Sequence, residues 1–346
     1  MMGITQQEAL DLFQSDDIVA IGMAANEVRR KKTDPRIATY QIDRNINYTN
    51  FCTEYCSFCA FYRPMGSKEG YVLSFEEICH KIDEMIELGG SGILLQGGLN
   101  TDLKLDYYEN LLRSLKQKYP RVHLQCFSEP EIICISEISG LSVRDTIARL
   151  RDAGLESIPG GGAEILDDEI RARISRLKCT SAEWELVHRE AHSLGLRTTA
   201  TMMFGCGESY HHRVNHFERV RRLQEETGGF TAFIPWIFAP ENTPLGKKVP
   251  ETTAVDYLKT LAISRLYLDN IDHIQSSWLT PGIKICQIGL QFGADDVGSI
   301  LIEENVVYAA GVRNRTNEAE LRRIISDAGY IPAQRDTLYR AYFLKQ

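Results

Sequence analysis

The stretch Cys52-Thr53-Glu54-Tyr55-Cys56-Ser57-Phe58-Cys59 brings three cysteines together at a C-x3-C-x2-C spacing. A loop this short can fold back so that three thiolates face one small inorganic centre. Cysteine thiolates are the usual protein ligands of iron–sulfur clusters. In a cubane of four irons, three such ligands leave one iron open to a small molecule. The stretch therefore indicates a cluster with a vacant coordination position, held by Cys52, Cys56 and Cys59.

Structural zinc is the alternative interpretation of these cysteines. Zinc sites of that kind normally have four ligands in two spaced pairs, and no second C-x2-C pair follows Cys59. Two histidine pairs with three intervening residues lie far along the chain and lack the glutamate of a zinc-hydrolase helix. We expect these histidines on the surface: His188 with His192, and His212 with His216, next to His211.

Charge and composition limit the possible partners. The 346 residues carry a net charge of −8 with both signs interspersed, so no nucleic-acid footprint is present. No apolar run approaches the length of a membrane span, and the first residues do not resemble a signal peptide. The nine cysteines are odd in number and lack a disulfide framework, which favours reduced thiols. We expect a cytoplasmic protein without nucleic-acid or membrane partners.

Strand and helix signals alternate about eight times along the chain, which predicts an α/β fold. A parallel (β/α)8 barrel of the TIM type is the simplest closed arrangement, and a doubly wound open sheet is the alternative. Helix starts are predicted at Ser74 to Glu77, Asp106 to Glu109, Ser142 to Asp145 and Asn317 to Glu320. Strands are predicted at 37–48, 93–96, 122–127, just before 158–164, and at 198–204, 230–238 and 273–278.

We expect residues 1–346 to form a single domain. Its barrel core spans about 35–312, with N-terminal helices in 1–34 and a C-terminal appendage in 313–346. In a βα barrel the loops that follow the strands form the active site. The cysteine loop follows the strand predicted at 37–48, so it marks that mouth of the barrel.

Other residues that follow predicted strands are candidate ligand contacts. Gln96, Gly97 and Gly98 follow the second strand, and glycines there allow a backbone to approach a ligand closely. Ser128 and Glu131 follow the third strand, and Glu164 follows the fourth. Carboxylates in a barrel mouth bind hydroxyl or ammonium groups.

Glycine and tryptophan residues mark the later strand ends. Gly160 to Gly162 favour close backbone approach, and the Lys-Ser/Thr of a phosphate loop is missing. Trp236 and Trp278 lie near the ends of the sixth and seventh strands, where an indole either packs in the core or stacks on a flat ligand.

The cysteine spacing, with Phe58 before the third cysteine, resembles the signature of the radical S-adenosylmethionine (SAM) enzymes. Over about residues 35–312 the chain is similar to the branch that includes the futalosine route to menaquinone and the deazaflavin synthases. The stretches that carry this resemblance are 45–50, Cys59-Ala60-Phe61-Tyr62-Arg63, Leu95-Gln96-Gly97-Gly98, 157–164, 199–205, 224–240 and 303–307.

The resemblance implies a [4Fe-4S] cluster whose open iron binds SAM, and a one-electron donor such as flavodoxin or ferredoxin. It also implies SAM contacts from Gln96, Gly97, Gly98, Ser128, Glu131 and Glu164. A 5′-deoxyadenosyl radical from SAM would then start the chemistry, for which the protein orients the substrate and excludes water. No residue is assigned a catalytic role beyond these contacts.

Three stretches are most similar to the members of the branch that cyclise dehypoxanthine futalosine, a base-free ribose with a benzoate-bearing chain. They are Phe233-Ile234-Pro235-Trp236, Gln275-Ser276-Ser277-Trp278 and Ser139-Gly140-Leu141-Ser142. The similarity implies hydrogen abstraction at C4′ of the ribose, followed by closure of a spiro ring. Aminofutalosine synthase is the alternative within the branch, and a non-catalytic cluster- or zinc-binding regulator is the alternative outside it.

The chain departs from the pattern of the branch at three places. Cys206 stands where histidine is usual, and Asp295 where asparagine is commoner. Leu99-Asn100-Thr101 replaces a stretch in which histidine and proline are commoner. These departures leave the cysteines unchanged, but they put the environment of the substrate in question.

Overall fold

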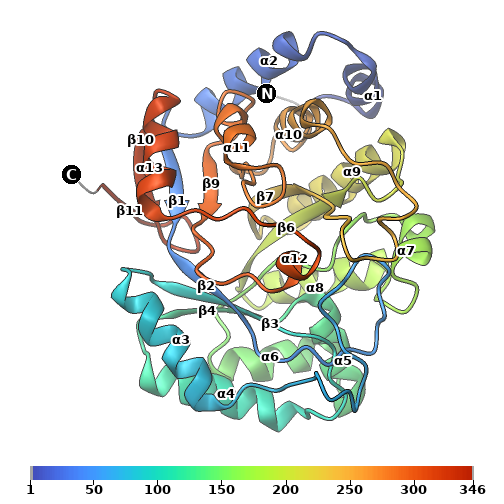
Figure 1. Cartoon of the computed structure of the whole chain (residues 1–346), viewed down its shortest axis with the longest axis vertical. Coiled ribbons are helices and arrows are strands. Elements are labelled where there is room, and N and C mark those ends of the chain that lie inside the picture. The colour runs from blue at the N-terminus through green and yellow to red at the C-terminus, as the bar shows by residue number, and fades with distance from the viewer. Residues whose placement is uncertain (1–2, 345–346) are drawn as a thin grey trace.

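A computed structural model describes residues 3–344, and its centre is a curled sheet of parallel strands surrounded by helices (Figure 1). Seven strands form this sheet in the order β2-β3-β4-β5-β6-β7-β8, and every pair is parallel. Their bounds are β2 (Asp43–Asn47), β3 (Gly92–Gln96), β4 (His123–Cys126), β5 (Ser157–Ile158), β6 (Arg197–Phe204), β7 (Phe230–Ile237) and β8 (His273–Ile274).

A second sheet, in the order β11-β10-β1-β9, spans the gap between β8 and β2. Gln275, directly after β8, forms a parallel bridge with Asp296 at the start of β9, and β9 pairs with β1. Since β1 leads straight into β2, the ring of strands closes and the TIM-type fold is confirmed. The second sheet contains β1 (Ile37–Gln41), β9 (Asp296–Ser299), β10 (Ile331–Arg335) and β11 (Tyr342–Phe343).

The prediction of one continuous strand at 37–48 is wrong, because two separate strands form there. The chain breaks at Ile42 into β1 and β2, which belong to different sheets. β1 pairs with β10, about 290 residues later in the chain, from Ile37 with Ile331 to Tyr40 with Gln334. A partner so distant in sequence leaves no local signal at residue 42.

Most of the helices lie on the outside of the ring (Figure 1), and three of the four predicted capping signals mark the start of a helix. Side chains of Ser74, Ser142 and Asn317 accept from the third backbone N–H of their helices, as predicted. The helix predicted from Asp106 instead begins at Leu105, without a side-chain cap. The helix bounds are α1 (Gln6–Gln14), α2 (Ile18–Lys32), α3 (Phe75–Glu87), α4 (Leu105–Lys118), α5 (Glu129–Ser139), α6 (Val143–Ala153), α7 (Asp168–Ile174), α8 (Ser181–Ser193), α9 (Tyr210–Thr227), α10 (Ala254–Tyr267), α11 (Ile283–Gly289), α12 (Val306–Ala309) and α13 (Glu318–Asp327).

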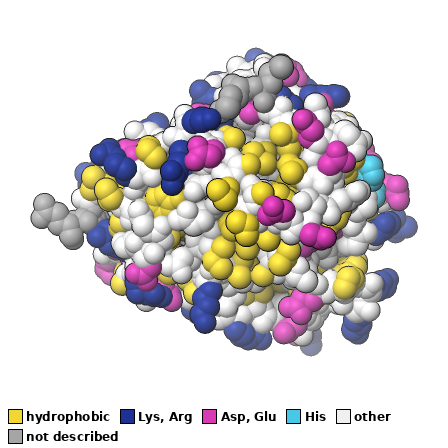
Figure 2. All heavy atoms as spheres, turned by 90° about the horizontal axis from the view of Figure 1, so that it is seen from above, with side chains coloured by type: hydrophobic (Ala, Val, Ile, Leu, Met, Phe, Trp, Pro, Cys, Tyr) yellow, Lys and Arg dark blue, Asp and Glu magenta, His cyan; other side chains and the backbone are white. Residues whose placement is uncertain are grey.

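Hydrophobic side chains fill the space between the strands and the helices in two clusters. Ile46 and Tyr48, for example, pack with α3 and α4 on the outer face of β2. On the face seen from above, hydrophobic side chains gather near the centre while acidic and basic ones are interspersed around them (Figure 2). Within residues 3–344, no helix is long and apolar enough to cross a membrane.

Polar side chains from several strands project into the interior of the barrel. Successive side chains of a strand point to opposite faces, and on β2 this alternation directs Asp43, Asn45 and Asn47 inward. Gln96 and Gln125 face the same interior from β3 and β4. Together with apolar and aromatic side chains, they line a cavity enclosed by the ring of strands.

Candidate active site

The cavity inside the barrel has a volume of about 430 Å³, within the usual range for small-molecule sites. It is lined by all nine residues that the sequence identifies as cluster or cofactor contacts: Cys52, Cys56, Cys59, Gln96, Gly97, Gly98, Ser128, Glu131 and Glu164. The structure thus brings together segments more than a hundred residues apart. For each of these residues, binding of the cluster or of SAM stays a prediction.

The cysteine loop follows β2 and is fixed by backbone hydrogen bonds to its surroundings. The amide of Cys52 donates to the carbonyl of Arg63 at 3.0 Å, and that of Ser57 donates to Ile174 at 2.8 Å. Within the loop, the amide of Cys59 donates to the carbonyl of Cys56 at 3.2 Å. These bonds hold the loop over the mouth of the barrel before any ligand arrives.

The donor set of three free cysteines in the cavity wall fits an iron–sulfur cluster, for which thiolates are the usual ligands. All are free, and burial raises the pKa of Cys56 to about 12, so its thiolate needs a cation beside it. Among residues 3–344, no three His, Cys, Asp or Glu side chains lie close enough to hold one ion. A cubane attaches each cysteine to a different iron and therefore separates the sulfurs more widely.

The turn after β3 lies directly against the cysteine loop. A Cβ on Gly98 would stand 2.2 Å from the carbonyl oxygen of Phe51 and 2.8 Å from Cβ of Cys52. A Cβ on Gly97 would meet the ring of Tyr48 at 2.8 Å. At Gly98 glycine is required because backbone packs on backbone, whereas at Gly97 the added atom would meet side chains. Both glycines are therefore closely packed by the protein itself, and their approach to a ligand stays a prediction.

Glu131 lies at the centre of a hydrogen-bond network beneath this turn. One carboxylate oxygen accepts from the hydroxyl of Tyr48 at 2.8 Å and the amide of Gly97 at 3.0 Å. The other accepts from the amide and hydroxyl of Ser128, both at 2.7 Å. Burial raises the pKa of Glu131 to about 7 although these hydrogen bonds lower it. Ser128 and Glu131 also form the capping box of α5, a helix that the sequence analysis missed.

Replacing Glu131 with glutamine is expected to lower the free energy of unfolding by about 1–3 kcal/mol, because one oxygen becomes an NH2 that faces N–H and O–H donors. The variant should also bind SAM more weakly, since the turn at Gly97 loses its support. Chemical denaturation and SAM titration measure the two effects. Glu137→Gln, on the exposed face of the same helix, is the control. Equal stability of the two variants would contradict the role assigned to Glu131.

Glu164 forms a buried ion pair with Lys178, a residue that the sequence analysis missed. The two side chains are 2.5 Å apart and almost completely buried. Charge on Glu164 and Cys56 raises the pKa of Lys178, against the effect of burial. Lys178 comes from the loop between α7 and α8 and in turn lowers the pKa of Cys56. A permanent cation therefore stands beside the cysteines. Only the fold reveals it, because nothing marks this lysine in sequence.

Aromatic and glycine residues complete the wall of the cavity. Trp236 and Trp278 both line it, and the indole N–H of Trp278 donates to the carbonyl of Ser299 at 2.8 Å. Gly160 lies against β6, where a Cβ would meet the carbonyl oxygen of Thr199 at 2.4 Å. Two indoles and a bare stretch of backbone thus belong to the wall of the cavity.

The opposite end of the cavity is formed by residues that the sequence analysis did not single out. They are Gln41, Asp43, Asn45, Arg335, Thr337 and Tyr339. A partial signal for the first three was present, because polar residues occupy every second position from 41 to 47, although Arg44 interrupts the alternation with apolar residues. The last three belong to the segment described above as a C-terminal appendage, and they reach the cavity through the pairing of β10 with β1.

The prediction of surface histidines is wrong for His188 and His216. Both are completely buried, and His188 contacts the buried carboxylate of Glu129 at 2.8 Å. His216 accepts from the amide of Leu166 at 3.0 Å. The helices that carry them pack against the sheet, which turns one histidine of each pair inward. Their bonds are structural, and they do not line the cavity.

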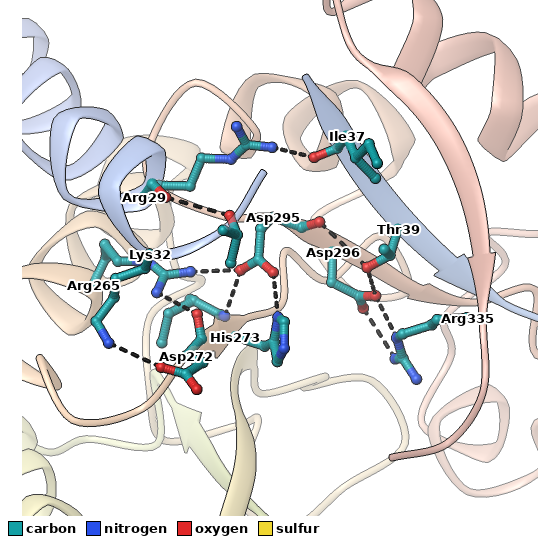
Figure 3. A network of polar contacts seen from close by, with 12 residues as sticks. Arg29, Lys32, Ile37, Thr39, Arg265, Asp272, His273, Asp295, Asp296 and Arg335 are labelled. Carbon is teal, nitrogen blue, oxygen red and sulfur yellow. Dashed lines mark hydrogen bonds and ion pairs between the residues drawn. The ribbon is translucent and has the colours of Figure 1, made fainter. Parts of the chain in front are cut away.

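The departures at Cys206 and Asp295 lie outside the cavity wall. Cys206 is completely buried, with Sγ 3.3 Å from a carboxylate oxygen of Glu208. Asp295 binds Arg265 at 2.5 Å and His273 at 2.6 Å in a buried network (Figure 3). Neither side chain lines the cavity, so the structure gives them a supporting role.

Comparison with protein families agrees with this site. The model of the radical SAM superfamily matches residues 46–220, which include the cysteine loop. The chain belongs to the radical SAM superfamily, and its cofactors are a [4Fe-4S] cluster and SAM. The model of the CofH/MqnC C-terminal region matches residues 227–345. The crystal structure of methylornithine synthase superposes with a TM-score of 0.75, covering 96% of this chain and 94% of that one at 18% identity, which shows the shared fold.

Relatives in the same branch carry several names. The chain is 49% identical to the cyclic dehypoxanthine futalosine synthase of Halalkalibacterium halodurans, covering 97% of this chain and 90% of the relative. The enzyme of that name from Streptomyces coelicolor is 43% identical, with 97% and 85% covered. A 5-amino-6-(D-ribitylamino)uracil–L-tyrosine 4-hydroxyphenyl transferase of Methanothermobacter thermautotrophicus is 42% identical (97% and 94%). The aminodeoxyfutalosine synthase of Thermus thermophilus is 38% identical (96% and 91%).

Proposed function

We propose that this radical SAM enzyme cyclises dehypoxanthine futalosine on a route to menaquinone. The observation that carries the proposal is the agreement between sequence and site. Of the relatives named above, the two with the higher identities bear this function in their names. Trp236, Gln275 and Trp278, from the stretches most similar to the cyclising members, all line the cavity.

In such a reaction the residues of this chain would exclude water, hold the sugar and offer a surface to the benzoate ring. When bound, the cluster and SAM supply a carbon-centred radical that takes a hydrogen atom from the sugar. The barrel must exclude water and hold the sugar toward the cysteine end of the cavity. The indoles of Trp236 and Trp278 provide a flat apolar surface for the benzoate ring that the sugar carbon attacks.

The direct test uses the anaerobically reconstituted enzyme, SAM, a reductant and dehypoxanthine futalosine deuterated at C4′. We expect deuterium in the 5′-deoxyadenosine and a product lighter than the substrate by its deuterium and one hydrogen, the stoichiometry of ring closure. The Cys56→Ala variant serves as the inactive control. Deoxyadenosine without deuterium, or none above that control, would contradict the proposal.

The two rival activities are tested in parallel. An aminofutalosine synthase would consume SAM with an enolpyruvyl benzoate, and a tyrosine transferase would consume tyrosine with the ribitylaminouracil. Neither mixture should yield deoxyadenosine above background with this enzyme. We also infer that a one-electron carrier such as flavodoxin or ferredoxin reduces the cluster, and either reduced protein should replace a chemical reductant in the assay.

A further inference from the structure

The cysteine loop is held between two other segments of the chain on the side that does not line the cavity. Ser57, the residue after Cys56, donates its backbone N–H to the carbonyl of Ile174 at 2.8 Å, and its hydroxyl donates to the same carbonyl at 2.9 Å. The carbonyl of Ser57 accepts from the amide of Leu245 at 2.9 Å. Ser57 does not line the cavity, so these contacts lie outside it.

Both of these segments are basic. Residues 170–178 contain four lysines and arginines, residues 242–250 contain two, and neither segment contains an acidic residue. The four of these cations that are exposed form what we call the basic rim: Arg173, Arg176, Lys247 and Lys248. Within residues 3–344, the last three form no ion pair. Because the whole chain has a net charge of −8, the basic rim is a local concentration of positive charge.

The two halves of the basic rim lie side by side. Arg173 donates from Nη2 to the carbonyl of Gly207 at 2.8 Å. A Cβ on Gly207 would stand 3.0 Å from that same nitrogen and 3.3 Å from a methyl carbon of Val249. Arg173 and the residue that follows Lys248 therefore meet at one point, and the four cations belong to one surface.

Two exposed hydrophobic side chains lie next to the basic rim. Tyr55, in the cysteine loop, is 49% exposed, and its ring packs edge-on against Tyr62 with the centroids 5.6 Å apart. Leu177, directly after Arg176, is 53% exposed. Hydrophobic and aromatic side chains with charged residues around them are typical of a protein–protein interface.

The position of the basic rim indicates what kind of partner it fits. Tyr55 and Ser57 flank Cys56, and neither of them lines the cavity, whereas the cysteine does. A protein bound at the basic rim would therefore have only the cysteine loop between itself and the cluster. Exposed cations attract an acidic partner and raise the rate of its encounter. Interfaces between electron-transfer partners are small and weak, which suits a few exposed charges beside two hydrophobic side chains.

We propose that the basic rim, together with Tyr55 and Leu177, is the docking surface for an acidic one-electron carrier protein that reduces the cluster. One electron leaves the reduced redox group of the carrier and enters the oxidised cluster, and no covalent bond is made or broken. The inference rests on the carrier proposed above, and it does not depend on which substrate the enzyme consumes.

The test measures the binding of flavodoxin, an acidic carrier, to the reconstituted enzyme. One variant carries Arg176→Glu and Lys247→Glu. The matched control carries Arg30→Glu and Arg121→Glu, which change the net charge equally at exposed positions before β1 and β4, at the amino ends of the strands. We expect the Kd of flavodoxin to rise about 10-fold or more in the first variant only, because two attractive charges become repulsive.

Two further measurements show whether the binding serves electron transfer. The rate at which reduced flavodoxin at limiting concentration reduces the cluster, followed by its visible spectrum, should fall by a similar factor in the first variant. Excess dithionite should reduce the clusters of all three proteins to the same extent, since a small reductant needs no docking surface. Raising the salt concentration should weaken the binding of flavodoxin to the unaltered enzyme.

Unchanged affinity and reduction rate in the first variant, or an equal loss in the control, would overturn the inference. Ferredoxin is measured in the same way, and a selective loss with either carrier supports the docking surface, since both are acidic. If neither carrier binds the unaltered enzyme, the carrier and its docking surface fall together, while cyclisation driven by dithionite is unaffected. Failure to consume dehypoxanthine futalosine with dithionite would defeat the proposed function and leave the docking surface standing.

Discussion

Replacing Cys56 with alanine is expected to remove the cluster and reduce SAM cleavage to the level without enzyme, while the fold remains. Cys56 lines the cavity between the other two cysteines and next to Lys178. Two thiolates cannot hold the cubane in the position that three define, and without it no electron reaches SAM. Iron and sulfide analysis, the visible spectrum and 5′-deoxyadenosine formation measure the loss.

Cys79→Ala is the matched control for this variant. Cys79 is equally buried but lies on α3, away from the cavity. It should keep its iron and its turnover, with only the small loss of stability that shortening a core side chain causes. Thermal unfolding of both apoproteins checks that neither has lost its fold. Full iron content and turnover in Cys56→Ala would refute the assignment of the ligands.

Replacing Gly98 with alanine is expected to displace the cysteine loop, because the turn after β3 packs directly against that loop. The added Cβ would overlap the backbone of Phe51 and the Cβ of Cys52. Since backbone atoms cannot move aside as a flexible side chain does, the loop itself must shift. We expect a loss of about 1–3 kcal/mol in the free energy of unfolding and a reduced iron content after reconstitution.

Gly66→Ala separates these two effects. Gly66 is exposed, has a φ of +77° and has no atom within 4 Å of an added Cβ. Alanine there costs about 1–2 kcal/mol of backbone strain, similar to the loss expected at Gly98, but it should leave the iron content unchanged. A Gly98→Ala protein with a full cluster would show that the turn after β3 does not position the cysteines.

The residues at the mouth of the barrel could be predicted because their signals are local. The cysteine spacing, the glycines after β3 and the Ser128-to-Glu131 stretch each lie within a few residues at the end of a strand. Because the carboxyl ends of barrel strands meet at one mouth, Glu164 could be placed beside these residues as well. Even here the sequence did not show that Glu131 accepts four hydrogen bonds, one each from Tyr48 and Gly97 and two from Ser128.

The remote end of the cavity depends on contacts that no local pattern records. The break at Ile42 exists because β1 pairs with β10, and this pairing brings Arg335 and Tyr339 to the cavity.

Lys178 reaches Cys56 from a loop without any motif. His188 looked like a surface residue because helical spacing does not tell which face of α8 packs on the sheet. Polar residues at every second position of 41–47 were a signal for the interior that Arg44 obscured.

The central claim is that Cys52, Cys56 and Cys59 hold one cubane whose remaining iron is open to SAM. Mössbauer spectroscopy of the protein reconstituted with iron-57, recorded before and after SAM is added, tests it most directly. The account predicts a [4Fe-4S] signal in which SAM changes the environment of a single iron. A spectrum that SAM leaves unaltered, or a chain that takes up one zinc ion in place of iron, would contradict it.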